Sequence, residues 1–121
     1  MNYDDRMDLE EKVRKKLAKR FGKPSKRSIV PQIEHDFDFV SADDSVVGEV
    51  KTSEPNSQNP NGNLRTATLG DISKDCLFLL TAKRARKILV LTNKTVCQKF
   101  KASKYGKAAQ MLGVEIENVN V

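Results

Sequence analysis

The chain has 121 residues, of which 38% are hydrophobic and 31% are charged. This length fits one domain with one core, so we expect residues 1–121 to form a single domain, and the composition excludes intrinsic disorder. No apolar run approaches the length of a membrane-spanning helix. The first residues also lack the basic-then-apolar order of a secretory signal, so we expect a cytoplasmic protein without a membrane partner.

The net charge of +6 is divided unevenly along the chain. Residues 11–27 hold nine Lys or Arg residues and one acid, and residues 76–114 hold nine with no acid. Residues 34–54 instead hold seven acids and one base, Lys51. An acidic segment between two basic ones suggests a metal-binding centre flanked by surfaces that attract polyanions.

The first expected element is a helix that begins after Asp8 and ends before Gly22. Its apolar residues recur along one face at helical spacing, namely Leu9, Val13, Leu17 and Phe21. Gly22 and Pro24 stop the helix, and residues 23–31 form a basic linker.

A β-hairpin is expected next, because the period changes from helical spacing to alternation. Apolar and polar residues alternate from Gln32 to Val40, which predicts a strand. A turn at 42–45 leads to a returning strand at 46–52, and 53–63 form a polar loop.

The second half of the chain predicts two helices and two strands. The first helix begins between Asn63 and Asp71, and its inner face carries Leu69, Ile72, Cys76, Leu79 and Leu80. The apolar run at 87–92 is typical of a buried central strand. Asn93 caps the second helix, which Gly106 interrupts and Gly113 ends, and which carries Val96, Phe100, Ala108, Met111 and Leu112. Residues 114–119 form the last strand. The order helix, strand, strand, helix, strand, helix, strand predicts an α/β domain with a central mixed sheet flanked by helices.

The hairpin brings two acids together. If its turn centres between Asp43 and Asp44, antiparallel pairing puts Asp38 opposite Glu49, with β-carbons about 5 Å apart. Like charges at that distance raise the pKa of one carboxyl group or attract a cation, and oxygen ligands of this kind suit Mg²⁺. Lys51 projects on the same face, one step along the strand. The sequence therefore predicts a metal-dependent site on this face.

The other face of the hairpin is apolar. The same register puts Phe37 over Val50 and Phe39 over Gly48, and the glycine makes room for the aromatic ring. His35 falls on this face, which is typical of a core histidine that bonds a backbone group.

The cysteines do not suggest a metal site. Cys76 and Cys97 are far apart and the chain has one histidine, which excludes a four-ligand zinc site and indicates reduced core thiols.

The segments His35–Val40 and Val47–Lys51 resemble the PD-(D/E)xK nuclease superfamily, which has the restriction-endonuclease-like fold. This chain and the family members share an acid at the end of one strand and Glu-x-Lys on the next strand. The order of helices and strands is also similar across nearly the whole chain. The resemblance implies catalytic roles for Asp38, Glu49 and Lys51. It also implies that Asp38, Glu49, the Val50 carbonyl and Glu10 hold Mg²⁺, with Mn²⁺ as a substitute.

Two assignments within this resemblance stay open. The proline that often precedes the first acid is absent, so the first acid is either Asp36 or Asp38; we prefer Asp38, and Asp36 then pairs with Lys51. Glu10 has the spacing to later apolar residues that many family members show, and Glu11 is the weaker choice.

The expected function is metal-dependent hydrolysis of phosphodiester bonds, with DNA as the expected nucleic acid. Five basic residues are candidates for phosphate contacts: Arg65, Lys74, Lys83, Arg84 and Lys104. Tyr105 would stack on a base, although the sequence shows no stacking platform around it.

The alternative is a nucleic-acid-binding module of the same fold that does not cleave or that depends on a partner. A homodimer or a partner subunit would supply target specificity in either case. A third hypothesis is a basic RNA- or ribosome-associated domain whose hairpin acids are solvated.

Overall fold

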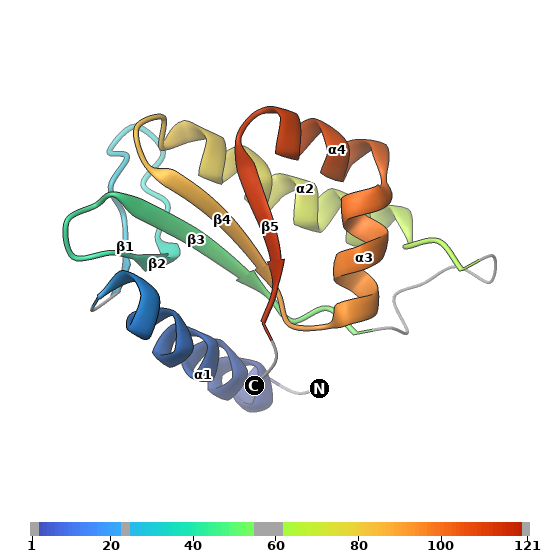
Figure 1. Cartoon of the computed structure of the whole chain (residues 1–121), viewed down its shortest axis with the longest axis horizontal. Helices are drawn as coiled ribbons and strands as arrows, with labels where there is room; N and C mark the ends of the chain where they lie inside the picture. Colours follow the sequence, from blue (N-terminus) through green and yellow to red (C-terminus); the bar gives the residue numbers. More distant parts are fainter. Residues whose placement is uncertain (1–2, 23–24, 55–61, 120–121) are drawn as a thin grey trace.

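The protein folds as a five-stranded mixed sheet with helices on both faces (Figure 1). The computed structural model describes residues 3–22, 25–54 and 62–119. The helices are α1 (Tyr3–Phe21), α2 (Thr66–Thr81), α3 (Lys94–Ala102) and α4 (Lys104–Met111). The strands are β1 (Ser25–Arg27), β2 (Phe37–Val40), β3 (Val46–Lys51), β4 (Arg86–Leu91) and β5 (Val114–Asn118). The prediction of an α/β domain with a mixed sheet flanked by helices is thus confirmed.

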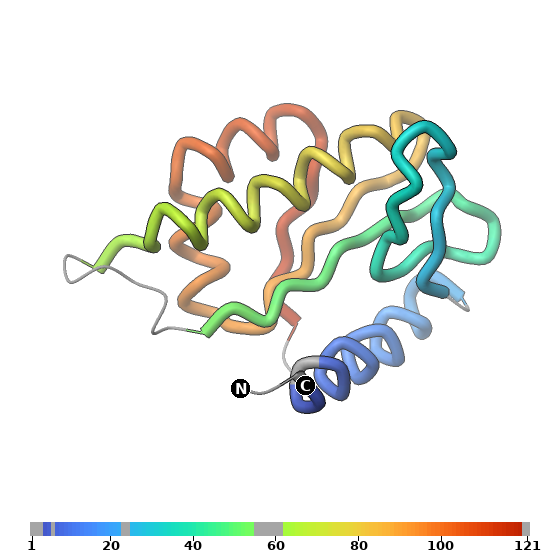
Figure 2. Tube along the Cα trace, turned by 180° about the vertical axis from the view of Figure 1, so that it is seen from behind, coloured from blue at the N-terminus to red at the C-terminus, as the bar shows by residue number. Residues whose placement is uncertain are grey.

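The strands lie in the sheet in chain order, from β1 to β5. The pairs β1–β2 and β2–β3 are antiparallel, and the pairs β3–β4 and β4–β5 are parallel. Figures 1 and 2 show α1 on one face of the sheet and α2, α3 and α4 on the other. The carboxyl ends of the three parallel strands therefore meet at one edge of the sheet.

Each face of the sheet has its own apolar core. On the α1 face, Val13 and Leu17 pack with residues from three strands: Phe39, Val46, Val50, Ile88 and Val90. Leu17 is fully buried, so its replacement by Ala would cost about 2–5 kcal/mol. On the other face, Ile72 and Leu79 of α2 pack with Leu89, Leu91 and Phe100. Because β4 is buried on both faces, its sequence is a continuous apolar run rather than an alternating one.

Helix α1 begins five residues earlier than Asp8, which the sequence favoured as the cap. Asp4 and Asp5 lie in its first turn, where acidic side chains interact favourably with the helix dipole.

The segment 23–40 differs most from the expected hairpin. Part of the predicted linker forms the short strand β1, which the sequence did not predict. The predicted strand from Gln32 is confined to Phe37–Val40, because residues 31–34 form a turn and Glu34 has a positive φ of 49°. A strand cannot continue through that conformation. Most of the predicted loop at 53–63 lies outside the described residues.

The last predicted helix is two helices, α3 and α4. The Asn93 side chain caps α3 as predicted, accepting the N–H of Val96 at 3.0 Å. Ser103 ends α3 in an extended conformation and caps α4 by accepting the N–H of Gly106 at 3.1 Å. A β-carbon at Gly106 would lie 1.9 Å from the Phe100 carbonyl oxygen, so only glycine permits this junction.

Two of the apolar residues that the sequence assigned to this helix are exposed, Met111 at 88% and Leu112 at 64%. Cys76 and Cys97 are buried and free, as expected. In the parts of the chain that the structure describes, no helix is both long and apolar enough to cross a membrane.

Candidate active site

The candidate site lies where β2 and β3 separate. Their ladder pairs Phe39 with Gly48 and Val40 with Val47, as the sequence predicted. One residue further, the Asp38 carboxylate accepts the backbone N–H of Val50 at 2.8 Å. This carboxylate therefore takes the place of a strand partner, and the same register puts it across from Glu49.

Phe37 and Phe39 do not share a face, contrary to the expectation from alternation. Phe39 packs in the α1 core, whereas Phe37 packs in the core under α2. The pairing of β1 with β2 shifts register between Ser25 and Arg27, which marks an irregularity in this ribbon. An irregularity of this kind changes the direction in which neighbouring side chains point.

His35 belongs to the site rather than to the core around Phe39. Its Nε2 lies 2.7 Å from Glu49 Oε1. The imidazole stacks on the ring of Phe78 from α2, with 3.9 Å between centroids, and meets Phe37 edge-on. The aromatic contacts fix the ring, and the Glu49 contact replaces the backbone partner that we expected.

Glu49 is the most buried acid of the site, with 4% of its side chain exposed. Burial, and next the neighbouring Asp38 and Asp75, raise the pKa of Glu49 to about 10. Burial also lowers the pKa of His35. At neutral pH Glu49 is therefore protonated and His35 uncharged, so their contact is a neutral hydrogen bond rather than an ion pair.

Lys51 is held by two acids of α2. Its Nζ lies 3.1 Å from Asp71 Oδ2 and 3.2 Å from Asp75 Oδ2. Burial opposes the charged amine, but these carboxylates outweigh it and raise the pKa of Lys51. Burial raises the pKa of Asp75 to about 6 although Lys51 opposes that shift. The expected pairing of Asp36 with Lys51 is wrong: Asp36 is exposed, and Asp38 is the acid beside Glu49.

Glu10 contributes an unsatisfied oxygen from α1. Its Oε2 is buried and finds no hydrogen-bond partner among the residues described. Burial and the nearby Asp38 raise the pKa of Glu10, while the charges of Lys26, Arg14 and Lys51 lower it. Glu11 is exposed. A buried oxygen without a partner costs free energy, and a bound cation would remove that cost.

Among the described residues, no three His, Cys, Asp or Glu side chains converge closely enough to hold a metal ion as they stand. The donor set nevertheless fits a hard cation, since Glu10, Asp38 and Glu49 offer carboxylate oxygens, one of them orphaned. Val50, whose carbonyl is the further expected ligand, lies between Glu49 and Lys51 on β3, and its backbone N–H donates to the Asp38 carboxylate. Closing this set around Mg²⁺ requires Glu49 to lose its proton.

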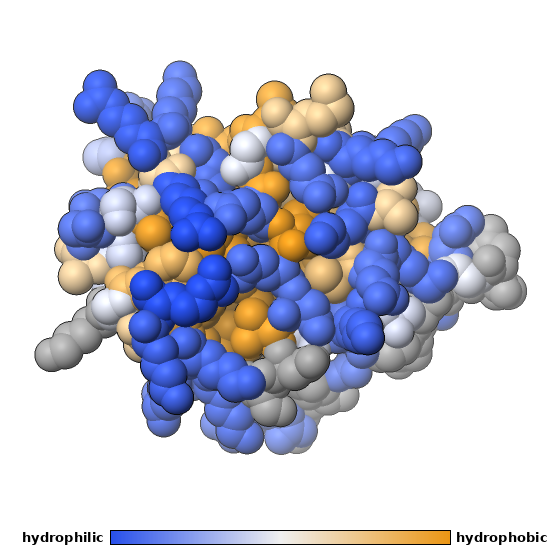
Figure 3. Space-filling view, in the orientation of Figure 1, coloured by the Kyte–Doolittle hydropathy of each residue, from blue (hydrophilic) through white to orange (hydrophobic). Residues whose placement is uncertain are grey.

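The five basic residues proposed for phosphate contacts lie at both ends of α2, within it and at the start of α4. Arg65 precedes α2, whereas Lys83 and Arg84 follow it, and a 16-residue helix spans about 24 Å. Lys74 pairs with Asp71 at 3.3 Å, and Lys104 begins α4. Hydrophilic side chains spread over the face in Figure 3 rather than gathering over one element.

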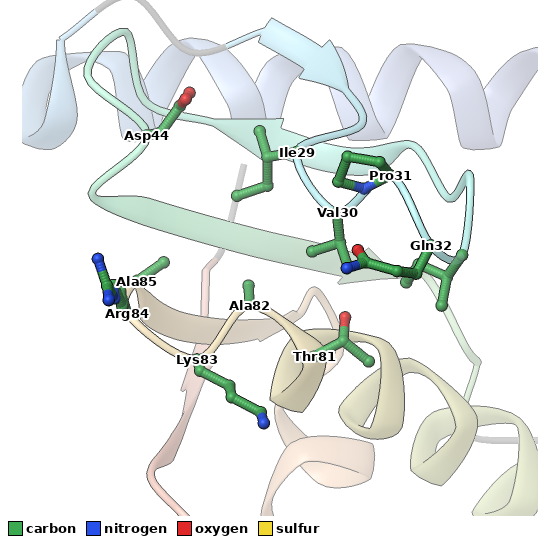
Figure 4. A pocket seen from close by; sticks show the side chains of 11 residues that line it. Ile29, Val30, Pro31, Gln32, Asp44, Thr81, Ala82, Lys83, Arg84 and Ala85 are labelled. Atoms are coloured by element: carbon green, nitrogen blue, oxygen red, sulfur yellow. The ribbon is translucent and has the colours of Figure 1, made fainter.

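Lys83 and Arg84 line a cavity of about 550 Å³ whose floor is mostly apolar. Figure 4 shows that Lys83 points away from Ile29 and Val30 in this cavity. The cavity and the acids of the site involve different residues.

Sequence reasoning missed Asp71, Asp75 and the contact of His35 with Glu49. A signal was present for the two aspartates, because they are four residues apart on α2, and Asp75 directly precedes the buried Cys76. Comparisons with family models, with curated proteins and with solved structures found no match.

Proposed function

We propose that this protein is a Mg²⁺-dependent nuclease of the PD-(D/E)xK type that acts on DNA. The observation that carries the proposal is the gathering of Asp38, Glu49 and Lys51 where β2 and β3 separate. Among the described residues, the ladder between β2 and β3 ends at the pair Phe39–Gly48, and the Asp38 side chain accepts the next N–H of β3, that of Val50.

Each residue of the site has a definite role in this proposal. Asp38, Glu49 and Glu10 bind Mg²⁺ through carboxylate oxygens, with the Val50 carbonyl as a further ligand. The bound ion supplies Lewis acidity and a water of lowered pKa. Lys51 directs its ammonium group toward the phosphate and offsets negative charge that develops there. Asp75 keeps that ammonium charged and in place.

The charge distribution supports a polyanionic substrate. The segment 76–114 carries nine basic residues and no acid, in a chain with a net charge of +6. Phosphate contacts from such segments give affinity without reading sequence. Target choice would then come from a second copy of the chain or from a partner subunit.

Plasmid cleavage by matched variants tests the proposal. Asp38→Asn and Lys51→Ala should abolish Mg²⁺-dependent cleavage and leave salt-dependent DNA binding intact. Asp36→Asn is the matched control, because it removes an exposed acid two residues away, and it should cut like the parent. Cleavage that survives EDTA, or an Asp38→Asn protein as active as the parent, contradicts the proposal.

The second candidate is a DNA-binding module of the same fold without cleavage. It is favoured by Lys51, which is already paired with two carboxylates. This candidate predicts DNA binding together with no cleavage at any Mg²⁺ or Mn²⁺ concentration.

A further inference from the structure

A second cavity, of about 500 Å³, lies beside the first turn of α2 and the junction of α3 with α4. Its lining is Asn63, Leu64, Leu69, Lys99, Ala102, Ser103, Lys104 and Tyr105. The volume falls within the range of small-molecule sites, about 300–1,000 Å³. None of these residues belongs to the candidate active site.

The lining combines an apolar floor with a basic rim. Leu64 is buried at the base, and Tyr105 is 46% exposed at the lip. Lys104 Nζ lies 5.4 Å from the centre of the Tyr105 ring. Lys99 also lines the cavity, with its Nζ 3.6 Å from where a β-carbon on Gly62 would be. The described residues of the lining include no acid, so the rim attracts anions.

This combination suits an unpaired nucleotide better than a duplex. A base offers a flat apolar face to a tyrosine ring and to leucine side chains, and the flanking phosphates are the anions that two lysines would bind. Bases inside a duplex are stacked on one another and cannot present a face to Tyr105.

The cavity and the candidate active site both contact α2, through Leu69 and Asp71 respectively. Leu69 lines the cavity, and Asp71, two residues further along α2, contacts Lys51. Two residues correspond to a rotation of about 200° around the helix axis. The cavity and Lys51 therefore lie on different sides of the same turns of α2.

We propose that this cavity binds an unpaired nucleotide of the substrate, with a base on Tyr105, Leu64 and Leu69 and its phosphates on Lys99 and Lys104. This inference rests on the proposed nuclease function and narrows it to DNA with a single-stranded segment. In this arrangement Leu64 and Leu69 lie in the same cavity as Tyr105 and form with it the stacking platform that the sequence did not show.

The chain has no tryptophan, so Tyr105→Trp introduces a single fluorescent reporter. In EDTA, where the proposed cleavage cannot occur, a 20-nucleotide oligo(dT) should quench its emission at saturation, whereas a blunt 20-base-pair duplex should not. Tyr105→Ala should weaken oligo(dT) binding by about fivefold to a hundredfold, the range expected for loss of one stacked base. Tyr105→Phe keeps the ring and should bind like the parent.

Lys104→Ala should weaken oligo(dT) binding more than Lys107→Ala does. Lys107 is exposed one turn along α4 and does not line the cavity, so it controls for loss of one charge. Unchanged indole emission from the Tyr105→Trp protein, or a Tyr105→Ala protein that binds oligo(dT) as tightly as the parent, overturns the inference. Because this assay measures binding without cleavage, its outcome is independent of the Asp38→Asn cleavage test.

Discussion

The carboxylate of Asp38 binds the backbone N–H of Val50 across the point where β2 and β3 separate. Asp38 thereby satisfies the N–H of Val50 on β3 and also places its carboxylate near Glu49. Truncation of Asp38 to Ala would leave a partly buried N–H without a partner, so it would confuse loss of structure with loss of chemistry. Replacement by Asn keeps an acceptor oxygen, which makes it the informative variant.

The stability of the metal-free protein should depend on pH through Glu49. Its pKa in the folded state, about 10, lies above the ordinary value of 4.5. The stability that protonated Glu49 contributes is complete below about pH 4.5 and is lost progressively as the pH rises toward 10. In urea denaturation with EDTA at pH 8–9, Glu49→Gln should therefore raise the free energy of unfolding by about 1–3 kcal/mol, and it should have little effect at pH 4.

Glu115→Gln is the contrasting control. The Glu115 carboxylate binds Arg86, with an oxygen 2.7 Å from a guanidinium nitrogen, and this hydrogen bond lowers the pKa of Glu115. Its contribution is present above the ordinary pKa and lost as the pH falls, so the variant should be slightly less stable at pH 8. If Glu49→Gln follows the same sign as Glu115→Gln, the protonated state of Glu49 is wrong.

Asp75 should matter more than Asp71 for activity. Both contact Lys51, but the Asp75 side chain is 9% exposed and that of Asp71 is 51% exposed. Water can replace the exposed partner more easily than the buried one. We expect Asp75→Asn to reduce kcat by about 10- to 100-fold, as loss of a supporting partner commonly does, and Asp71→Asn to reduce it less. Equal losses in single-turnover cleavage would contradict this ranking.

Gly48 should tolerate no side chain. A β-carbon there would lie 1.7 Å from Phe39 Cε1, whereas one at Gly70 on α2 would meet nothing within 4 Å. Gly48→Ala should lower the free energy of unfolding by about 1–3 kcal/mol through overpacking. Gly70→Ala should raise it by about 0.5–1 kcal/mol because alanine favours the helix. Urea denaturation of both variants measures this pair, and a neutral Gly48→Ala would mean that Phe39 repacks freely.

Glu10 should bind the metal and Glu11 should not. Glu10 offers a buried, unpartnered oxygen near Asp38, and its neighbour is exposed. Glu10→Gln should weaken Mn²⁺ binding by about tenfold or more in calorimetric titrations, on the scale of other changes at metal sites. Glu11→Gln carries the same change of charge and should bind Mn²⁺ like the parent. Equal affinities for the two variants would remove Glu10 from the proposed ligands.

The sheet and the register of its hairpin were predictable because local rules govern them. A short turn fixes which residues face each other, so the pairs Phe39–Gly48 and Val40–Val47 followed from the position of the turn. The apolar run of β4 likewise identified a strand that is buried on both faces.

The remaining parts depend on contacts between segments far apart in the chain. Strand β1 has three polar residues and no alternation, so only its pairing with β2 makes it a strand. The irregularity around Asp38 sends Phe37 and His35 toward α2, which no periodicity of the hairpin indicates. The partners of Lys51 depend on how α2 packs on the sheet, and a sequence pattern does not specify that packing.

Helix α1 contacts elements that come much later in the chain, since Arg20 near its end pairs with Glu117 of the last strand, β5, at 2.7 Å. The strands of the sheet occur in chain order, so during folding each one can be added beside a strand that is already placed. Helix α1 is different, because its core partners lie on strands that follow it in the chain. The first helix of the chain should thus dock late. A φ-value analysis would then give low values for Val13 and Leu17 and higher values within β3 and β4.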